Sequence, residues 1–93
     1  MVGKNVLRGR LELIYDILKN CLEPTPPTRI MLSAGLHYNY WKDYLVLLNK
    51  QGLIEKLPSP RNSNAKYLLR VTPLGRKLLK LLMDSYKLLG WEV

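Results

Sequence analysis

Residues 27–56 read PTRIMLSAGLHYNYWKDYLVLLNKQGLIEK, and this stretch decides the fold. Its first part is a short helical segment that ends at Gly35, because glycine readily adopts the left-handed backbone conformation found after a helix. A longer helical segment follows and ends at Gly52, and the LIEKL after it has the composition of a strand. The stretch therefore predicts two helices joined by a tight turn and followed by a strand.

The residues before this stretch predict another helix. Leu11, Ile14 and Leu18 recur at spacings of three and four, which marks an amphipathic helix over residues 10–22. The sequence EPTPPT at residues 23–28 ends it, because proline has no amide hydrogen and clashes with the preceding helical turn.

Start and stop signals then place the two helices of the central stretch. Thr25 followed by Pro26 is a start signal, so we expect the second helix to run from there to about Ala34. We expect the third helix to begin at residue 36 or 37 and to end at about Gln51.

The remaining residues predict a hairpin and a last helix. The segments LIEKL and KYLLRVT form two strands around the turn-forming loop PSPRNSNA, and Thr72 then caps a helix that begins with Pro73 and stops at Gly90. The order α-α-α-β-β-α is mainly α with a β-hairpin and predicts a winged helix-turn-helix with a C-terminal dimerisation helix. The expected divisions are a basic arm at residues 1–8, the DNA-binding domain at 9–72 and the dimerisation helix at 73–90.

Charge narrows the class of partner. The chain has 93 residues and a net charge of +8, which fits a single domain that binds a polyanion, either nucleic acid or an anionic membrane surface. No apolar run approaches the roughly 20 residues that cross a bilayer, and no signal-peptide pattern follows the first residues. We therefore expect a cytoplasmic, nucleoid-associated protein and no membrane protein.

The residues that carry catalytic chemistry are scarce. One cysteine, Cys21, allows no internal disulfide and, with a single histidine, His37, provides too few ligands for a zinc site. Cys21 falls on an apolar helix face, which favours a buried thiol over a reactive one. Gly-rich phosphate loops, a nucleophile with a matching base and paired carboxylates are also lacking. We expect no enzyme activity, no cofactor and no small-molecule ligand.

The third predicted helix has the features of a DNA-recognition helix. Trp41, Tyr44 and Leu48 form an apolar stripe for the core, so the opposite face presents polar residues near the start of the helix. Asparagine pairs with adenine and lysine donates to guanine, although a polar face is also common on ordinary surface helices. Tyr40 could extend the core or reach a phosphate, and His37 suits either helix capping or a position near DNA. The candidate DNA-binding residues of this segment are His37, Tyr38, Asn39, Tyr40 and Lys42.

Two further segments suit phosphate contacts. Thr28 and Arg29 lie in the first turn of the second helix, where free amides and the helix dipole attract anions. The hairpin tip carries hydrogen-bond donors and no carboxylate, which fits a wing that lies on the DNA backbone, although a plain solvated turn would have a similar composition. The candidate residues of the tip are Arg61, Asn62, Ser63, Asn64 and Lys66.

The last helix predicts a homodimer. Leu74, Leu78, Leu81 and Leu88 follow coiled-coil spacing with Ser85 interrupting it, and Leu79, Leu82, Tyr86 and Leu89 form a second stripe one residue over. One stripe would cover the chain's own core and the other a second subunit, unless the first helix covers both. The candidate interface residues are Leu78, Leu81, Leu82, Ser85, Tyr86 and Leu89.

The central stretch resembles the helix-turn-helix segment of small basic winged-helix DNA-binding proteins of crenarchaeal chromatin and of related archaeal predicted transcriptional regulators. The run ThrArgIleMet at 28–31, Leu36, Tyr38, Tyr44 and the strand after Gly52 carry the resemblance, which RLELIYDIL and ThrProLeuGly extend over about residues 9–80. It implies dimers joined by an antiparallel coiled coil of the last helices, which bind DNA with little or modest sequence preference. Two departures are a last helix of at most about 17 residues, or about 25 Å, and a longer wing loop at residues 57–66.

These features lead to one main functional expectation and two alternatives. The main one is binding of duplex DNA by a small transcriptional regulator or chromatin-type protein. The first alternative is a winged-helix module for protein–protein interaction without direct DNA readout. RNA binding is the second, and it is disfavoured because the aromatic residues are not arranged as a strand platform for stacking bases.

Overall fold

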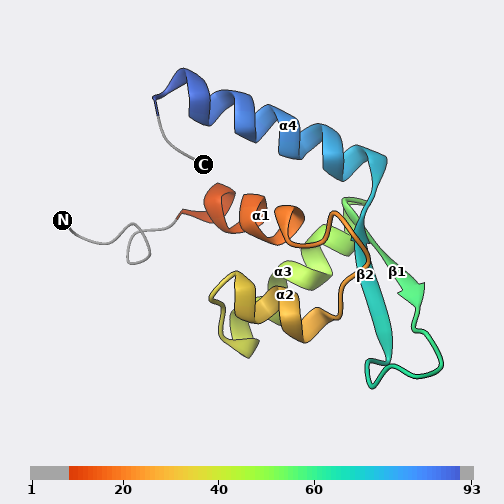
Figure 1. Cartoon of the computed structure of the whole chain (residues 1–93). Helices are drawn as coiled ribbons and strands as arrows, with labels where there is room; N and C mark the ends of the chain where they lie inside the picture. The colour runs from red at the N-terminus through yellow and green to blue at the C-terminus, as the bar shows by residue number, and fades with distance from the viewer. Residues whose placement is uncertain (1–8, 91–93) are drawn as a thin grey trace.

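A computed structural model of the chain describes residues 9–90, and the expected basic arm at residues 1–8 lies outside the described residues. The order of elements is the predicted α-α-α-β-β-α (Figure 1). The elements are α1 (Arg10–Lys19), α2 (Pro27–Ser33), α3 (Tyr38–Lys50), β1 (Ile54–Pro58), β2 (Tyr67–Val71) and α4 (Pro73–Leu88).

The first helix is shorter than the periodicity predicts. It ends at Lys19 instead of residue 22, and the side-chain amide of Asn20 donates to the carbonyl of Asp16 at 2.7 Å. The carbonyl of Cys21 accepts a hydrogen bond from the Val71 amide at 2.8 Å, so the backbone here leaves the helix to join β2.

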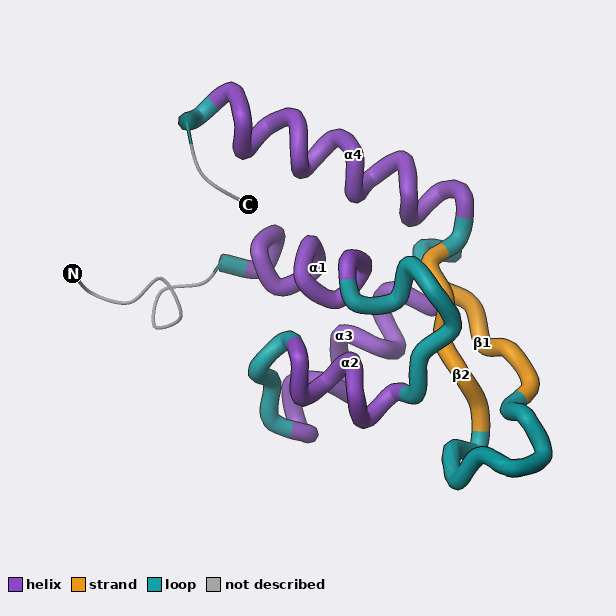
Figure 2. The backbone as a smooth tube through the Cα atoms, viewed as in Figure 1, coloured by secondary structure: helices purple, strands orange, loops and turns teal. Residues whose placement is uncertain are grey.

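The predicted cap of the second helix is wrong for a similar reason. Thr25 exchanges two backbone hydrogen bonds with Leu69 of β2, at 3.0 and 2.9 Å, as an isolated antiparallel bridge. The N-cap position therefore falls to Pro26, and no side chain caps α2. The segment between α1 and α2 thus fastens the helices to the hairpin, as the loop trace beside β2 shows (Figure 2).

The turns around α3 confirm the glycine predictions. Gly35 and Gly52 both have positive φ angles, of 70° and 73°, which other residues rarely adopt. After Gly52 the strands pair in antiparallel register from Ile54 opposite Val71 to Pro58 opposite Tyr67.

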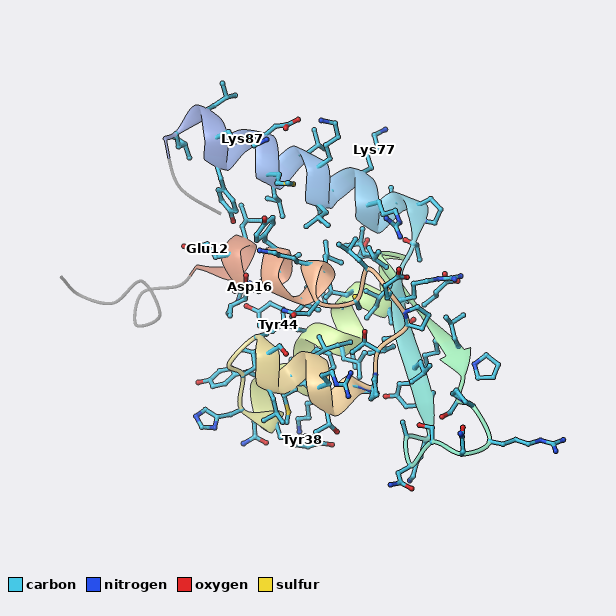
Figure 3. All side chains as sticks on the ribbon, viewed as in Figure 1. Glu12, Asp16, Tyr38, Tyr44, Lys77 and Lys87 are labelled. Carbon is cyan, nitrogen blue, oxygen red and sulfur yellow. The ribbon has the colours of Figure 1, made fainter. Side chains whose placement is uncertain are left out.

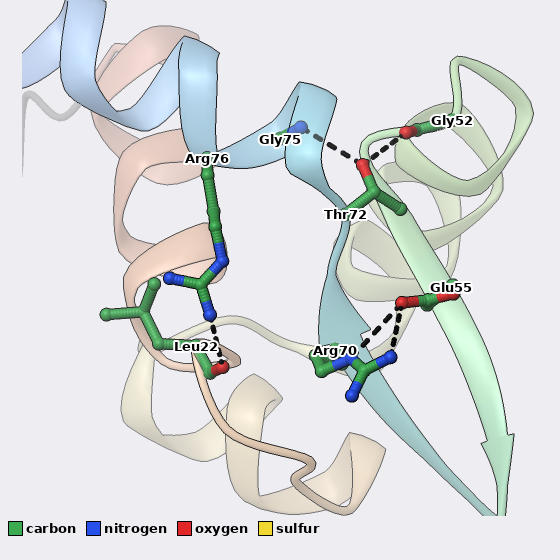
Figure 4. A network of polar contacts seen from close by, with 7 residues as sticks. All are labelled: Leu22, Gly52, Glu55, Arg70, Thr72, Gly75 and Arg76. Carbon is green, nitrogen blue, oxygen red and sulfur yellow. Dashed lines mark hydrogen bonds and ion pairs between the residues drawn. The ribbon is translucent and has the colours of Figure 1, made fainter.

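The junction between β2 and α4 is tightly packed. Thr72 caps α4 as predicted, because its hydroxyl oxygen accepts the Gly75 amide at 3.0 Å, and the same hydroxyl donates to the carbonyl of Gly52 (Figure 4). A Cβ at Gly75 would collide with the Leu53 carbonyl and a Val71 methyl group, so only glycine fits there. Arg76 also donates to the carbonyl of Leu22 at 3.2 Å, which ties α4 to the segment between α1 and α2.

One core joins all six elements. The helix α4 lies along the side of α1 that faces away from α2 and α3 (Figure 1). At this contact the rings of Tyr15 and Tyr86 meet edge to face with their centres 5.3 Å apart. The buried core residues are Tyr15, Ile17, Leu18, Cys21, Ile30, Ala34, Trp41, Leu48, Ile54, Leu69, Val71, Leu79, Leu82 and Tyr86.

Candidate nucleic-acid interface

The third helix divides into a buried and an exposed face. Trp41 and Leu48 are buried, and Tyr44 and Leu45 are half-buried against the core. The opposite face carries exposed side chains along the whole helix. They are Asn39, Lys42, Asp43, Val46 and Lys50.

The start of the helix is also exposed. Tyr38 and Tyr40 have 66% and 63% of their surface accessible, so Tyr40 does not extend the core, and its hydroxyl is free to reach a partner. His37 occupies the N-cap position, but only its backbone takes part, with its carbonyl accepting the amides of Tyr40 and Trp41. The His37 side chain is exposed.

The first turn of α2 offers fewer amides than the sequence indicates. Pro26 and Pro27 carry no amide hydrogen, and the Arg29 amide donates to the Pro26 carbonyl at 3.1 Å. Of the two first-turn amides expected to be free for an anion, that of Arg29 is therefore engaged. The exposed side chains of Thr28 and Arg29 are the groups there that can contact a phosphate.

The hairpin tip presents its donors to solvent with one exception. Arg61, Asn62, Asn64 and Lys66 are exposed. Ser63 shapes the turn, because its amide donates to the Pro60 carbonyl at 3.0 Å and its hydroxyl accepts the Ala65 amide at 3.2 Å.

The two strands of the hairpin carry one acidic residue, Glu55, and its charge is paired. Glu55 of β1 pairs with Arg70 of β2 through two hydrogen bonds of 3.1 and 3.0 Å to one carboxylate oxygen (Figure 4). The Lys56 ammonium lies 4.8 Å from the centre of the Tyr67 ring. With Glu55 paired, Lys56 and the cations of the tip determine the charge of the wing.

The structure separates the two apolar stripes of α4. Leu82 and Tyr86, which the sequence pattern assigns to the dimer interface, are instead buried at 7% exposure in the core, where Tyr86 meets Tyr15 of α1. Leu78 is half-buried and Ser85 is exposed. Leu79 is buried in the core as well, whereas four other leucines of α4 and its C-cap are exposed. Their accessible fractions are 53% for Leu74, 56% for Leu81, 90% for Leu88 and 61% for Leu89.

Beside this exposed stripe lies an open groove of about 390 Å³. Its walls come from α4, from the end of α3 and from the residue before β1. They are Gln51, Leu53, Leu74, Lys77, Leu78 and Leu81. Lys77 and Lys87 project outward from α4, at the opposite end of the molecule from Tyr38 (Figure 3).

Three apolar residues of α2 and α3 are exposed, and the sequence did not lead us to expect them there. Leu32 of α2 is 68% exposed, and Val46 and Leu47 of α3 are 66% and 44% exposed. Val46 follows Asn39 by seven residues, which is two helical turns, and this spacing was the available signal that both share a face.

Burial controls the one thiol. Cys21 has no exposed surface, and burial raises its pKa from 9.0 to about 11, so the thiol stays protonated at neutral pH. Among residues 9–90, no group of three His, Cys, Asp or Glu side chains is close enough to hold a metal ion. Within the same residues, every helix is too short or too polar to cross a membrane.

Comparison with solved structures finds a DNA-binding protein and two transcriptional regulators. The chain is similar to Sso10a-2, a DNA-binding protein from Sulfolobus solfataricus, with 28% identity and a TM-score of 0.74 over 89% of this chain and 83% of that one. It also resembles the PcaV transcriptional regulator from Streptomyces coelicolor, with 23% identity and a TM-score of 0.68 over 77% of this chain and 54% of that one.

A third similar structure is a MarR family transcriptional regulator from Silicibacter pomeroyi, with 17% identity and a TM-score of 0.65 over 88% of this chain and 57% of that one. At these identities the two regulators support the fold alone. No curated protein matches the sequence. The family model described as winged helix-turn-helix matches residues 7–89. The chain therefore belongs to the winged helix-turn-helix family.

Proposed function

We propose that this protein binds duplex DNA as a small transcriptional regulator or chromatin-type protein, with α3 in the major groove and the hairpin wing on the flanking backbone. The observation that carries the proposal is the exposed face of α3, which presents Asn39 and Lys42 on a helix whose other side is anchored in the core. The net charge of +8 and the family membership support it. The proposal assigns no catalytic role to any residue.

The exposed side chains suggest a division of roles. Asn39 suits adenine, Lys42 suits guanine, and both lie in the first half of α3, the part of a recognition helix that reaches bases. The residues around them contact phosphates and set the position of the helix. These are Thr28, Arg29, His37, Tyr38 and Tyr40, with Arg61, Asn62, Asn64 and Lys66 on the wing.

The exposed stripe of α4 supports a homodimer. Leu74, Leu78, Leu81 and Leu88 are spaced by four, three and seven residues, which is the pattern of a coiled-coil seam. Leu81 precedes the buried Leu82 by one residue, so it points about 100° around the helix from the core. The seam therefore lies on a face of α4 next to the one that packs on the core. A second copy packed against the seam would cover the open groove that Leu74, Leu78 and Leu81 line.

A titration of random duplex DNA at several salt concentrations tests the proposal. Each subunit should neutralise roughly three to six phosphates, and each contact should contribute about −0.9 to the slope of log affinity against log salt. A flat salt response would reject DNA binding.

A flat response would instead favour the module for protein–protein interaction. This alternative is supported by the exposed apolar side chains of Leu32, Val46 and Leu47, which could contact a partner protein. Binding to a protein through these residues would not weaken with salt, so capture of a partner in high salt, without DNA binding, would support this second candidate.

A further inference from the structure

The exposed face of α3 carries a single carboxylate, that of Asp43. Asp43 is exposed and, among the residues that the structure describes, forms no hydrogen bond or ion pair. It is the only acidic residue between Pro27 and Lys50. The acid on the wing, Glu55, is paired with Arg70 at 3.0 Å. Asp43 is therefore the one unpaired negative charge on the described helices and strands proposed to meet DNA.

The position of Asp43 lies in the centre of that face. It follows Asn39 by four residues and precedes Val46 by three, so the three side chains project within about 60° of each other around the helix. Along the axis the steps are about 6 Å and 4.5 Å, which correspond to about two base pairs and one base pair at 3.4 Å each.

The residue types on this strip suit base edges better than phosphates. A carboxylate is repelled by phosphate, and the methyl groups of Val46 gain nothing from a charged oxygen. Both residue types have partners in the major groove, where amino groups of bases donate hydrogen bonds and thymine presents a methyl group. The strip of Asn39, Asp43 and Val46 therefore faces the floor of the groove when α3 is inserted.

We propose that Asp43 is a base-selecting residue, whose carboxylate accepts a hydrogen bond from the N4 amino group of cytosine and weakens binding wherever that amino group is missing. The inference rests on the proposed DNA binding by α3. Guanine and thymine present acceptor oxygens to the carboxylate and repel it. Adenine has an amino group beside its N7 acceptor, so it is a poorer partner than cytosine, which presents the amino group alone.

The substitution Asp43→Asn tests this assignment, because it keeps the size of the side chain and removes the charge. The matched control is Glu23→Gln, which also raises the net charge by one but alters an exposed residue between α1 and α2. Each protein is used to select from a duplex library with a randomised central segment. Binding is then titrated on the preferred duplex and on duplexes with each base pair replaced.

The wild-type chain and Glu23→Gln should select one cytosine position for each bound subunit, and replacing that base pair should weaken binding roughly 5- to 150-fold. Asp43→Asn should bind random duplex more tightly than wild type and should lose most of this preference. Replacing the selected cytosine with 2-pyrimidinone, which lacks the amino group, should weaken the wild type more than Asp43→Asn, because the amide oxygen of asparagine accepts the same hydrogen bond without the negative charge.

Two results overturn the inference while leaving the proposed function intact. One is salt-dependent DNA binding by the wild type with no preferred cytosine. The other is a cytosine preference that survives in Asp43→Asn. A wild-type chain that binds no duplex at any salt concentration would instead reject the proposed function itself, so the two failures are distinguishable.

Discussion

Single residues in this chain hold the hairpin and the helices together through their backbones. Thr25 pairs with Leu69, and Cys21 accepts the amide of Val71, so the segment between α1 and α2 behaves as an extension of the hairpin. These hydrogen bonds join residues that are far apart in the chain, so they form only in the folded tertiary structure. They also explain why Cys21 is fully buried.

Burial of Cys21 makes a prediction about alkaline pH. Its pKa is about 11 in the folded chain against an ordinary value of 9.0 for a solvated thiol, so the unfolded chain loses this proton first as the pH rises. The stability linked to the protonated thiol is fully present below pH 9 and is lost as the pH rises through 11. We expect the free energy of unfolding to fall by about 2–3 kcal/mol over this range.

The measurement is urea unfolding between neutral pH and pH 11, with Cys21→Ala as the control. Other groups titrate in both proteins, so the difference between the two pH profiles isolates the thiol. Equal profiles for wild type and Cys21→Ala would show that burial does not perturb this group.

At the scale of elements, α4 has two duties on two of its faces. One face packs in the core through Leu79, Leu82 and Tyr86. The neighbouring face leaves Leu74 and Leu81 exposed. The cation–anion pair of Lys80 and Asp84 is exposed at 3.1 Å and contributes little to stability. The helix is therefore held by its apolar contacts, by the Thr72 cap and by the contact of Arg76 with Leu22.

The substitution Leu81→Glu should convert the proposed dimer into a monomer. Leu81 is 56% exposed, so the charge disturbs the seam without entering the core, whereas the neighbouring Leu82 is buried and its substitution would unfold the chain. Sedimentation equilibrium at tens of micromolar measures the change. Leu11→Glu is the matched control, because Leu11 of α1 is 57% exposed and lies outside the seam. Wild-type protein that is already monomeric would contradict the dimer.

At the scale of the whole molecule, the direction of the seam determines what a dimer can do. The seam points about 100° around α4 from the face that packs on the core. The helix α3 lies on the far side of α1 from α4 (Figure 1). A two-fold dimer joined at the seam, with its axis running from α4 toward α3, would leave both α3 helices on the same side, where they can enter successive major grooves of one duplex.

Duplex length should reveal the two contacts. Two recognition helices about 34 Å apart need about 20 base pairs of DNA, so affinity should rise steeply between duplexes of about 12 and about 24 base pairs. The rise comes from joining two half-sites in one complex, and Leu81→Glu should lack it. Affinity that grows only in proportion to the number of available sites, equally in both proteins, would contradict a two-site dimer.

The sequence by itself determined the order of elements and the identity of the exposed face of α3. These predictions succeed because their signals are local. Gly35 and Gly52 end helices by their backbone freedom, Thr72 and Pro73 start one, and the spacing of Trp41 and Leu48 marks the buried side.

Only the tertiary structure decided which stripe of α4 meets the core, where Tyr40 points and what Thr25 does. Stripes one residue apart have the same periodicity, so the sequence cannot distinguish them, and the position of α1 selects the one that contains Leu82. Thr25 has the composition of a helix cap, but β2 lies beside it and offers two backbone hydrogen bonds instead. These features depend on contacts between residues far apart in the chain, and a local sequence pattern does not predict such contacts.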